Sequence, residues 1–215
     1  MSNKSYQQYC GIAAALDRVG DRWTLLVLRE LSFGEQRFTD LRGALPGIAS
    51  NLLTERLREL EADGLVEQRD LPAPAARTVY ALTGDGRRII PVLRALARFG
   101  MPFLDEPVEG HVRPRTAVFG GVGALLDPVA AAGVDLRVRF DLDGEEHWLE
   151  VRGGRLVRAD RAREPDVTVS GSAAALVELL RGADPDSLAP RLRLTGSRTA
   201  LRRFRTVFPV PVPAG

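Results

Sequence analysis

The sequence predicts an α+β protein of two successive domains, and three observations carry this prediction. Residues 34–82 have the pattern of a short helix, a turn, a longer helix and two strands, in that order. Residues 105–115 contain Pro107, Gly110 and Pro114, which are typical of a connection between compact parts. From residue 136 onward, short strands and helices alternate. We therefore expect an N-terminal domain at 1–104, a linker at 105–115 and an α/β domain at 116–215.

The composition is that of a water-soluble globular protein. Hydrophobic residues make up 45% of the 215 residues, and no apolar run reaches the roughly 18 residues that a membrane span needs. The first ten residues lack the apolar core of a secretory signal, so we expect a cytoplasmic protein with no membrane partner. The net charge is only +2, with 14 basic and 12 acidic side chains in residues 1–104. A net charge this small does not identify a nucleic-acid partner. Evidence for such a partner must come from the positions of the charged residues.

The longer helix of residues 34–82 has one buried and one polar side. It is expected to begin near Ala49, with Ser50 as its capping side chain, because a Pro-Gly pair ends the helix before it. Its inward stripe consists of leucines at helical spacing, namely Leu53, Leu57 and Leu60. The outward side chains suit the reading of base edges in a major groove. These candidate DNA-binding residues are Ser50, Asn51, Thr54 and Arg58.

Two strands are expected after this helix, at residues 65–69 and 78–82, with a tip rich in proline and alanine between them. This order of helices and hairpin is that of a winged helix-turn-helix. Arg69 and Arg77 stand at the base of the tip, where arginine can enter a minor groove or hold a phosphate. The alternative is a solvated hairpin with ordinary surface arginines.

Several segments of the first half together carry a resemblance to a known family. They are Cys10, LDRVGDRWTLLVLREL at 16–31, RFTDL at 37–41, GI at 47–48, LTERLRELE at 53–61 and YALTGDG at 80–86. In this combination they resemble the HxlR family of bacterial winged-helix transcription regulators. The resemblance implies a homodimer that binds double-stranded DNA at an inverted repeat. Repression is the commoner outcome for such an architecture, and we expect it here.

The remaining helices of the first half have apolar faces. Residues 9–19 are expected to form an amphipathic helix, and Asp21 is expected to cap the helix that follows. Residues 85–104 are expected to form a long helix that Thr83 caps and Pro91 bends. This long helix has more apolar positions than one small core requires. The surplus is expected to pack against the N-terminal helix of a second subunit.

Cys10 is the one cysteine, which excludes an intramolecular disulfide. One interpretation is a redox switch, in which Cys10 bridges to its copy in the partner subunit. A helix N-terminus lowers a thiol pKa, and the resemblance to the HxlR family implies relatives that sense oxidants near this position. The other interpretation is an inert thiol at a helix start.

The second half is expected to form a sheet with helices. Residues 116–133 have the pattern of an apolar helix interrupted at Pro128. Strands are expected at 136–142, 147–152, 155–159, 166–170 and 191–195, and helices at 172–181, from 186, and at 197–208. The segments PDVTVSG at 165–171, 173–182 and LRLTGS at 192–197 resemble the sterol carrier protein fold, an α/β fold around an apolar tunnel.

That resemblance implies a small apolar ligand in the C-terminal domain. The candidate ligand-binding residues are Phe119, Val122, Leu125, Leu126, Phe204 and Phe208, and ordinary core packing is the alternative for each. His111 and His147 have no cysteine or acidic cluster at metal-ligand spacing, and no catalytic or phosphate-binding motif occurs. We therefore expect a non-enzymatic regulator without cofactor or metal. In an alternative reading, the C-terminal domain is only a dimerisation or protein-interaction scaffold.

Overall fold

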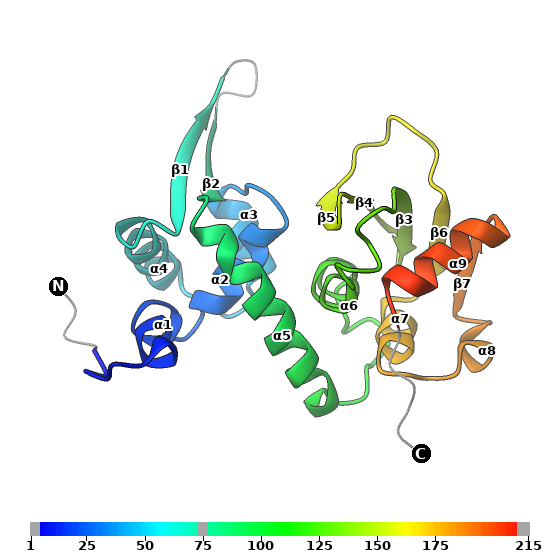
Figure 1. The fold of residues 1–215 in the computed structure, drawn as a ribbon, viewed down its shortest axis with the longest axis horizontal. Helices are drawn as coiled ribbons and strands as arrows, with labels where there is room; N and C mark the ends of the chain where they lie inside the picture. The colour runs from blue at the N-terminus through cyan, green and yellow to red at the C-terminus, as the bar shows by residue number, and fades with distance from the viewer. Residues whose placement is uncertain (1–4, 73–76, 210–215) are drawn as a thin grey trace. The chain divides into compact units, whose positions relative to one another are not determined.

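The computed structural model describes residues 5–72 and 77–209, and its chain divides into two compact units, Met1–Leu93 and Arg94–Gly215. Figure 1 shows helices and a two-stranded hairpin in the first unit, and a sheet with helices in the second. The α+β class expected from the sequence is confirmed. No helix in the described ranges has both the length and the apolar character that crossing a membrane requires.

Four α-helices and a hairpin build the first unit. The helices are α1 (Gly11–Val19), α2 (Thr24–Ser32), α3 (Phe38–Ala44) and α4 (Ser50–Ala62), and the hairpin strands are β1 (Val66–Leu71) and β2 (Arg77–Leu82). β1 and β2 pair antiparallel, with Val66 opposite Leu82. Gln36 forms an additional antiparallel bridge with Tyr80, which joins the segment before α3 to the hairpin. The order of elements is that of a winged helix-turn-helix.

The core of this unit is aliphatic. Its centre is formed by side chains with no exposed surface, from three helices: Val27 and Leu28 of α2, Leu41 of α3 and Leu53 of α4. Trp23 is partly buried and packs against this core, as expected for an aromatic anchor.

The long helix expected at residues 85–104 is divided in the structure. A 3₁₀ turn, η1 (Gly86–Ile89), precedes α5 (Ile90–Gly100), and a second 3₁₀ turn, η2 (Met101–Phe103), follows it. Pro91 lies in the first turn of α5, where its missing N–H has no helical acceptor to lose, so it does not bend a continuous helix. Thr83 accepts a hydrogen bond from the Gly86 N–H at 2.9 Å, at the start of η1.

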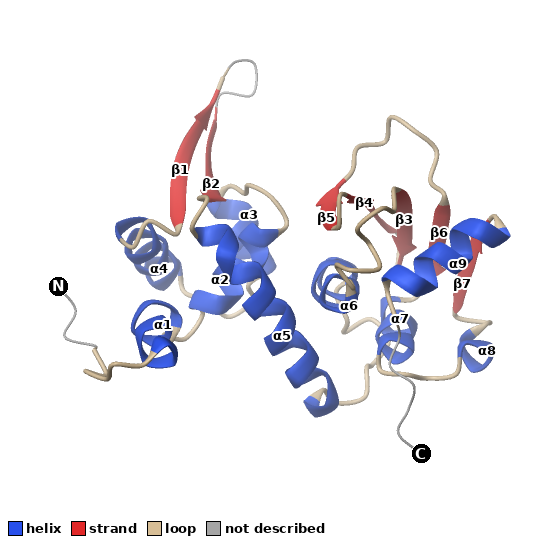
Figure 2. Ribbon diagram, viewed as in Figure 1, coloured by secondary structure: helices blue, strands red, loops and turns tan. Residues whose placement is uncertain are grey.

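The second unit is built on a five-stranded sheet, coloured red in Figure 2. Its strands, in the order β5-β4-β3-β6-β7, are β5 (Arg155–Arg158), β4 (Glu145–Arg152), β3 (Leu136–Leu142), β6 (Val167–Gly171) and β7 (Leu192–Gly196). β3 is the central strand: it pairs antiparallel with β4 and parallel with β6. All five strands expected from the sequence are present, with ends shifted by one or two residues.

The helices of the second unit are short, and two of them begin after a serine whose side chain caps the helix. α7 (Ala173–Leu180) begins at Ser172, whose hydroxyl accepts a hydrogen bond from Ala175 N–H at 3.1 Å. α9 (Arg198–Val207) begins at Ser197, whose hydroxyl accepts from Ala200 N–H at 3.1 Å. α8 (Pro185–Leu188) is a single turn.

The apolar segment after residue 115 differs from the expected long helix. It forms a π-helical stretch, η3 (Thr116–Val122), one turn of α-helix, α6 (Gly123–Leu125), and then turns up to residue 133. Gly121 packs against the side chain of Leu180 in α7, so close that a β-carbon there would lie 2.6 Å from a Leu180 methyl carbon. The apolar composition therefore reflects burial rather than a single regular helix.

One face of the sheet is apolar and the other carries paired charges. Arg137 of β3 and Glu150 of β4 stand opposite each other, and both are almost completely buried. Arg137 donates to Asp160 at 2.9 Å, and Arg163 donates to Glu150 at 3.1 Å. These ion pairs hold the segment between β5 and β6 against the sheet.

Candidate nucleic-acid interface

Helix α4 separates buried and exposed side chains as the sequence predicts. Leu53, Leu57 and Leu60 are at most 1% exposed and pack in the core. The outward side of the same helix carries Ser50, Asn51, Thr54 and Arg58, all four exposed. The protomer therefore leaves this polar face open to an external partner.

The N-terminus of α4 has no side-chain cap. The N-cap position is Ala49, so the expected capping role of Ser50 is wrong: Ser50 is the first residue inside the helix. Gly47, with φ of 88°, makes the turn that leads into the helix, a conformation that glycine adopts without strain. The Ser50 carbonyl accepts a hydrogen bond from the Thr54 hydroxyl at 3.0 Å. In the described part of the chain, no side chain caps the N–H groups of the first turn.

Arg56 fixes α4 to the rest of the unit. Its guanidinium lies on the buried side of the helix and donates hydrogen bonds from Nη1 to the carboxylates of Asp21 and Glu59. Asp21 thus binds α4, and the N-cap position of α2 is Trp23 rather than the expected Asp21. Sequence reasoning missed Arg56, although its position shares the inward stripe: it lies three residues after Leu53 and four before Leu60.

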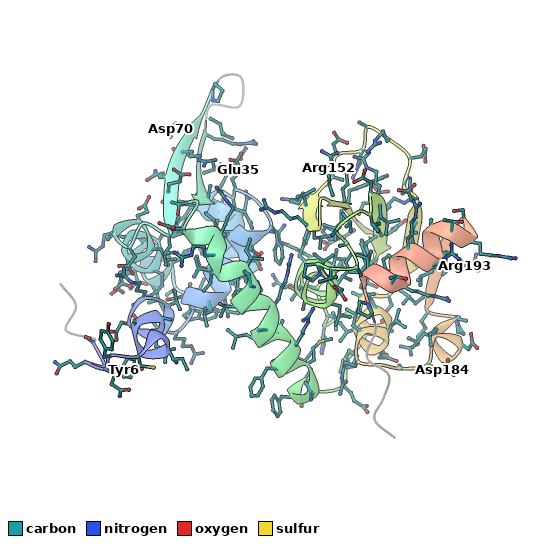
Figure 3. All side chains as sticks on the ribbon, in the orientation of Figure 1. Tyr6, Glu35, Asp70, Arg152, Asp184 and Arg193 are labelled. Atoms are coloured by element: carbon teal, nitrogen blue, oxygen red, sulfur yellow. The ribbon has the colours of Figure 1, made fainter. Side chains whose placement is uncertain are left out.

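The hairpin of β1 and β2 projects as the wing. The side chain of Arg69 forms an ion pair with Glu67, whereas that of Arg77 is exposed. Asp70, labelled in Figure 3 towards the far end of β1, accepts a hydrogen bond from the Thr78 hydroxyl at 2.7 Å and so links the two strands. Residues 73–76, which include most of the expected proline- and alanine-rich tip, lie outside the described residues.

The base of the wing is closely packed. Thr83 donates a hydrogen bond to the carbonyl of Gly64 at 2.6 Å. Gly86 approaches the backbone of Leu65 so closely that a β-carbon would lie 1.9 Å from the Leu65 carbonyl oxygen. The position of the wing relative to α4 is therefore set by backbone contacts that admit no larger residue at Gly86.

The thiol of Cys10 is exposed at the N-cap position of α1. Hydrogen bonding from the backbone N–H groups of Ala13 and Ile12 lowers the pKa of this thiol below its ordinary value. The protein thus carries a surface thiol with increased thiolate character.

Large apolar side chains are exposed on two helices and next to them. On α1, Ile12 is 73% exposed and Leu16 is 41% exposed, so part of the apolar face expected for this helix is open to solvent in the described residues. α5 has no fully buried residue, and Phe99 near its end is 71% exposed. Other members of this exposed apolar group are Tyr6, Tyr9, Val92, Leu96 and Phe103.

The six candidate ligand-binding residues of the second unit are buried. The Phe204 and Phe208 rings lie against each other, with centroids 5.1 Å apart. Leu125 also borders a surface pocket of about 470 Å³, together with Arg98, Asp127, Pro128 and Pro209. The full set is Phe119, Val122, Leu125, Leu126, Phe204 and Phe208, each no more than 6% exposed.

His147 lies in a cationic surrounding beside Phe119. The rings of Phe119 and His147 meet edge to face, with centroids 5.5 Å apart. The guanidinium carbons of Arg115 and Arg158 lie 5.3 Å and 5.5 Å from the centre of the Phe119 ring. Burial, opposed by Glu145 and assisted by the two arginines, lowers the pKa of His147. Within the described ranges, no group of three or more His, Cys, Asp or Glu side chains is placed to hold a metal ion.

Comparisons with known proteins match the two parts of the chain separately. A family model described as HxlR-like helix-turn-helix matches residues 18–107, and one described as SCP-2 sterol transfer family matches residues 126–209. Both resemblances seen in the sequence are thereby confirmed.

The similar proteins and structures cover the N-terminal half. An uncharacterized HTH-type transcriptional regulator of Synechocystis sp. is 40% identical over 97 residues, which make up 45% of this chain and 72% of that protein. A regulator of the same description from Mycobacterium tuberculosis is 38% identical over 104 residues, 48% of this chain and 65% of that protein. Among solved structures, the reduced form of the transcriptional regulator YodB from Bacillus subtilis is 29% identical, covers 46% of this chain and 97% of that one, and has a TM-score of 0.40.

Proposed function

The chain belongs to the HxlR-like helix-turn-helix family of transcriptional regulators, and from that premise we propose that it binds operator DNA as a homodimer through α4 and the wing. The sequence specificity, the subunit arrangement and the control by a ligand are all part of this proposal. Because its target is DNA, we also propose that it acts in the cytoplasm.

The observation that carries the proposal is the division of α4 into an anchored and an open side. The leucine stripe and Arg56 hold the helix in the core. Asn51 is exposed near the N-terminus of the helix, where an amide can bond the N6 and N7 positions of adenine. Ser50 and Thr54 offer hydroxyl groups beside it, and Arg58 offers a guanidinium one turn further on.

The missing side-chain cap of α4 supports a phosphate contact. The N–H groups of a helix N-terminus carry partial positive charge and bind phosphate oxygens well. No side chain of the described residues caps these groups in α4, so a DNA backbone can approach them. Arg77 on the wing is exposed and is assigned to a phosphate or a minor groove. Arg69 forms an ion pair with Glu67. It can contact DNA in the same way only after this ion pair breaks.

The exposed apolar side chains of α1 and α5 are assigned to the interface between two copies of the chain. Large apolar side chains exposed along a helix are typical of an interaction surface. Pairing through α1 and α5 presents two copies of α4 to one duplex, and half-sites about 34 Å apart then match one helical turn of DNA. We expect Leu96→Asp to convert the dimer into a monomer, as measured by light scattering.

DNA fragments selected by the full-length protein from its source genome provide the test. With such a fragment, Asn51→Ala should weaken binding by about 5- to 150-fold, the equivalent of the roughly 1–3 kcal/mol that one bidentate base contact provides. The dimer should remain intact, because Asn51 is exposed and distant in sequence from α1 and α5. Arg77→Ala should weaken binding to all sequences about equally. An Asn51→Ala protein with unchanged affinity would remove α4 from its assigned role.

For the second unit, we propose that a small apolar molecule binds and changes operator affinity, with repression as the regulatory outcome. The match to the SCP-2 sterol transfer family supports an apolar ligand. A coupling of about 1–3 kcal/mol is enough to change DNA affinity by about 5- to 150-fold.

A second candidate role, that of a dimerisation or protein-interaction scaffold, is favoured by the burial of all six candidate lining residues. Titration of the full-length protein with an apolar fluorophore distinguishes the two roles. Saturable uptake at one site per protomer supports the ligand, and uptake should then change affinity for the selected DNA. No uptake, with the dimer intact, supports the scaffold.

The thiol of Cys10 adds an optional redox control to either role. Its exposure and lowered pKa favour reaction with peroxide, and a bridge to the partner subunit's copy is the expected product. A peroxide effect on DNA binding that is present in the wild-type protein and absent in Cys10→Ser would establish this control. If the two proteins respond alike, the thiol is inert.

A further inference from the structure

The C-terminal part of the chain has an unusual distribution of charge. No acidic residue follows Asp186, whereas six arginines do. Four of these arginines lie on helix α9 and are exposed: Arg198, Arg202, Arg203 and Arg205. The opposite side of α9 is buried through Ala200, Phe204 and Val207. The helix therefore covers the core with one face and presents positive charge on the other.

This charge is unfavourable for the isolated helix. Arg198 occupies the first helical position, where the positive end of the helix dipole favours an acidic side chain. Arg198 and Arg202 are four residues apart, and Arg202 and Arg205 are three apart, so like charges repel along one face. Within the described residues, none of the four forms an ion pair, whereas Arg191, just before β7, pairs with Glu178 at 2.7 Å. Among residues 5–72 and 77–209, no acidic side chain is paired with these arginines to offset the repulsion.

Three of the arginines also share one concave surface. Arg198, Arg202 and Arg205 border an open groove of about 360 Å³, together with Leu201 and Thr206. At about 1.5 Å of rise per residue, their backbone positions span about 10 Å along the helix axis.

We propose that this face of α9 is a second contact of the protein with duplex DNA, made to the phosphate backbone without reading the sequence. A row of exposed guanidinium groups on a rigid helix is complementary to a row of phosphates, and arginine binds phosphate with two parallel hydrogen bonds. The negative charge of bound phosphates would offset the repulsion between the arginines of α9. The inference rests on the proposed DNA-binding function, because a duplex held by α4 is already in the same complex as α9.

Other anionic partners fit this face less well. An amphipathic helix that lies in a lipid bilayer inserts its apolar face, but the apolar face of α9 is buried against the sheet of its own unit. A single-stranded nucleic acid is usually held by exposed aromatic rings, and the aromatic rings of and next to α9, those of Phe204 and Phe208, are buried. Phosphate contact with a duplex requires neither feature.

The salt dependence of DNA binding tests the proposal. The probe is a fluorescein-labelled duplex of about 40 base pairs with random sequence, long enough for several protein footprints, since each base pair adds about 3.4 Å. Binding to full-length protein is measured by anisotropy at increasing KCl concentration. Each arginine that contacts phosphate contributes about 1 to the slope of log K against log salt. We therefore expect the triple variant Arg198→Gln, Arg202→Gln, Arg205→Gln to lose about 3 from the slope per bound protomer.

Two control proteins distinguish a direct contact of α9 with phosphate from a general effect of the protein's net charge. The corresponding triple Arg→Lys variant keeps the charges and should keep a slope close to that of the wild-type protein. Arg155→Gln, at an exposed arginine of β5, removes a charge elsewhere in the same unit and should leave the slope unchanged. If the triple glutamine variant proves unfolded by circular dichroism, the single variant Arg202→Gln decides instead, with an expected loss of about 1 from the slope.

The possible outcomes are distinct. If the wild-type protein binds DNA but the glutamine variant keeps its slope, the proposed role of α9 is wrong while the role of α4 stands. If the wild-type protein binds neither the random duplex nor any selected genomic fragment, the proposed function itself fails. If the glutamine variant loses only its binding to phosphatidylglycerol vesicles, the face binds lipid and the DNA proposal is overturned.

Discussion

Removal of the Arg56 side chain is expected to destabilise the first unit without altering the side chains that we propose to contact DNA. The side chain of Arg56 is 7% exposed and forms ion pairs with Asp21 and Glu59, with Glu55 a further 3.5 Å contact. Arg56→Ala would leave these carboxylates without their shared cation. It would also remove the bond between α4 and the segment that precedes α2.

The magnitude follows from the exposure of the partners. Removing one member of a buried ion pair typically costs about 3–5 kcal/mol. Asp21 and Glu59 are 38% and 32% exposed, so their carboxylates regain water after the substitution. We therefore expect a smaller loss, about 2–3 kcal/mol. For a unit of this size, 1 kcal/mol corresponds to about 4–8 °C, which gives a fall in melting temperature of about 8–24 °C.

Thermal unfolding of the full-length protein, followed by calorimetry, provides the measurement. Arg58→Ala is the matched control, because Arg58 is on the same helix but exposed; its melting temperature should change by less than about 4 °C, whereas its DNA affinity should fall. A melting temperature of Arg56→Ala within about 2 °C of the wild-type value would refute the reasoning, because an unneeded ion pair would leave stability unchanged.

Three further outcomes are expected. Gly86→Ala should lower both the stability of the first unit and its DNA affinity, because the added carbon meets the Leu65 backbone at 1.9 Å; thermal melts and DNA titration would show this, and an unchanged protein would contradict the close contact. Leu126→Ala should cost about 2–5 kcal/mol in urea unfolding of the second unit, because the side chain has no exposed surface; a loss below about 1 kcal/mol would argue against a packed core there. Because burial holds the pKa of His147 below its ordinary value of 6.5, the unfolded chain takes up the proton more readily; the stability from neutral His147 is complete above about pH 6.5 and is lost as pH falls through the lower folded-state pKa. His147→Asn should remove this pH dependence from the melting temperature, and an identical pH profile in both proteins would exclude His147 as its source.

The order of elements could be predicted from the sequence because local signals set it. The leucine spacing defined the buried side of α4, and Ser172 and Ser197 marked the starts of α7 and α9 as capping residues do. The strict alternation of residues 136–142 located β3. These features depend on residues within one or two turns of each other, which the sequence displays directly.

The structural features that the sequence analysis missed depend on contacts between segments far apart in the chain. In the sequence, Arg56 has the pattern of an exposed charged residue. Its partner Asp21 lies 35 positions away in the chain, so only the folded structure shows the pairing. The periodicity of α1 shows an apolar face but not whether its own core or another molecule covers it, and Ile12 is exposed in the protomer. The segment η3 likewise packs against α7, as at Gly121 and Leu180, a contact that the local sequence pattern does not display.

The central position of β3 has a consequence for the synthesis of the protein on the ribosome. β4 follows β3 immediately and can pair with it as soon as both emerge, but the strand on its other side, β6, begins only at Val167. Until then one edge of β3 offers unpaired backbone groups to any neighbouring polypeptide. A nascent chain that stalls after Arg158 would expose this edge, which makes the interval before β6 appears the stage at which aggregation or chaperone capture is favoured.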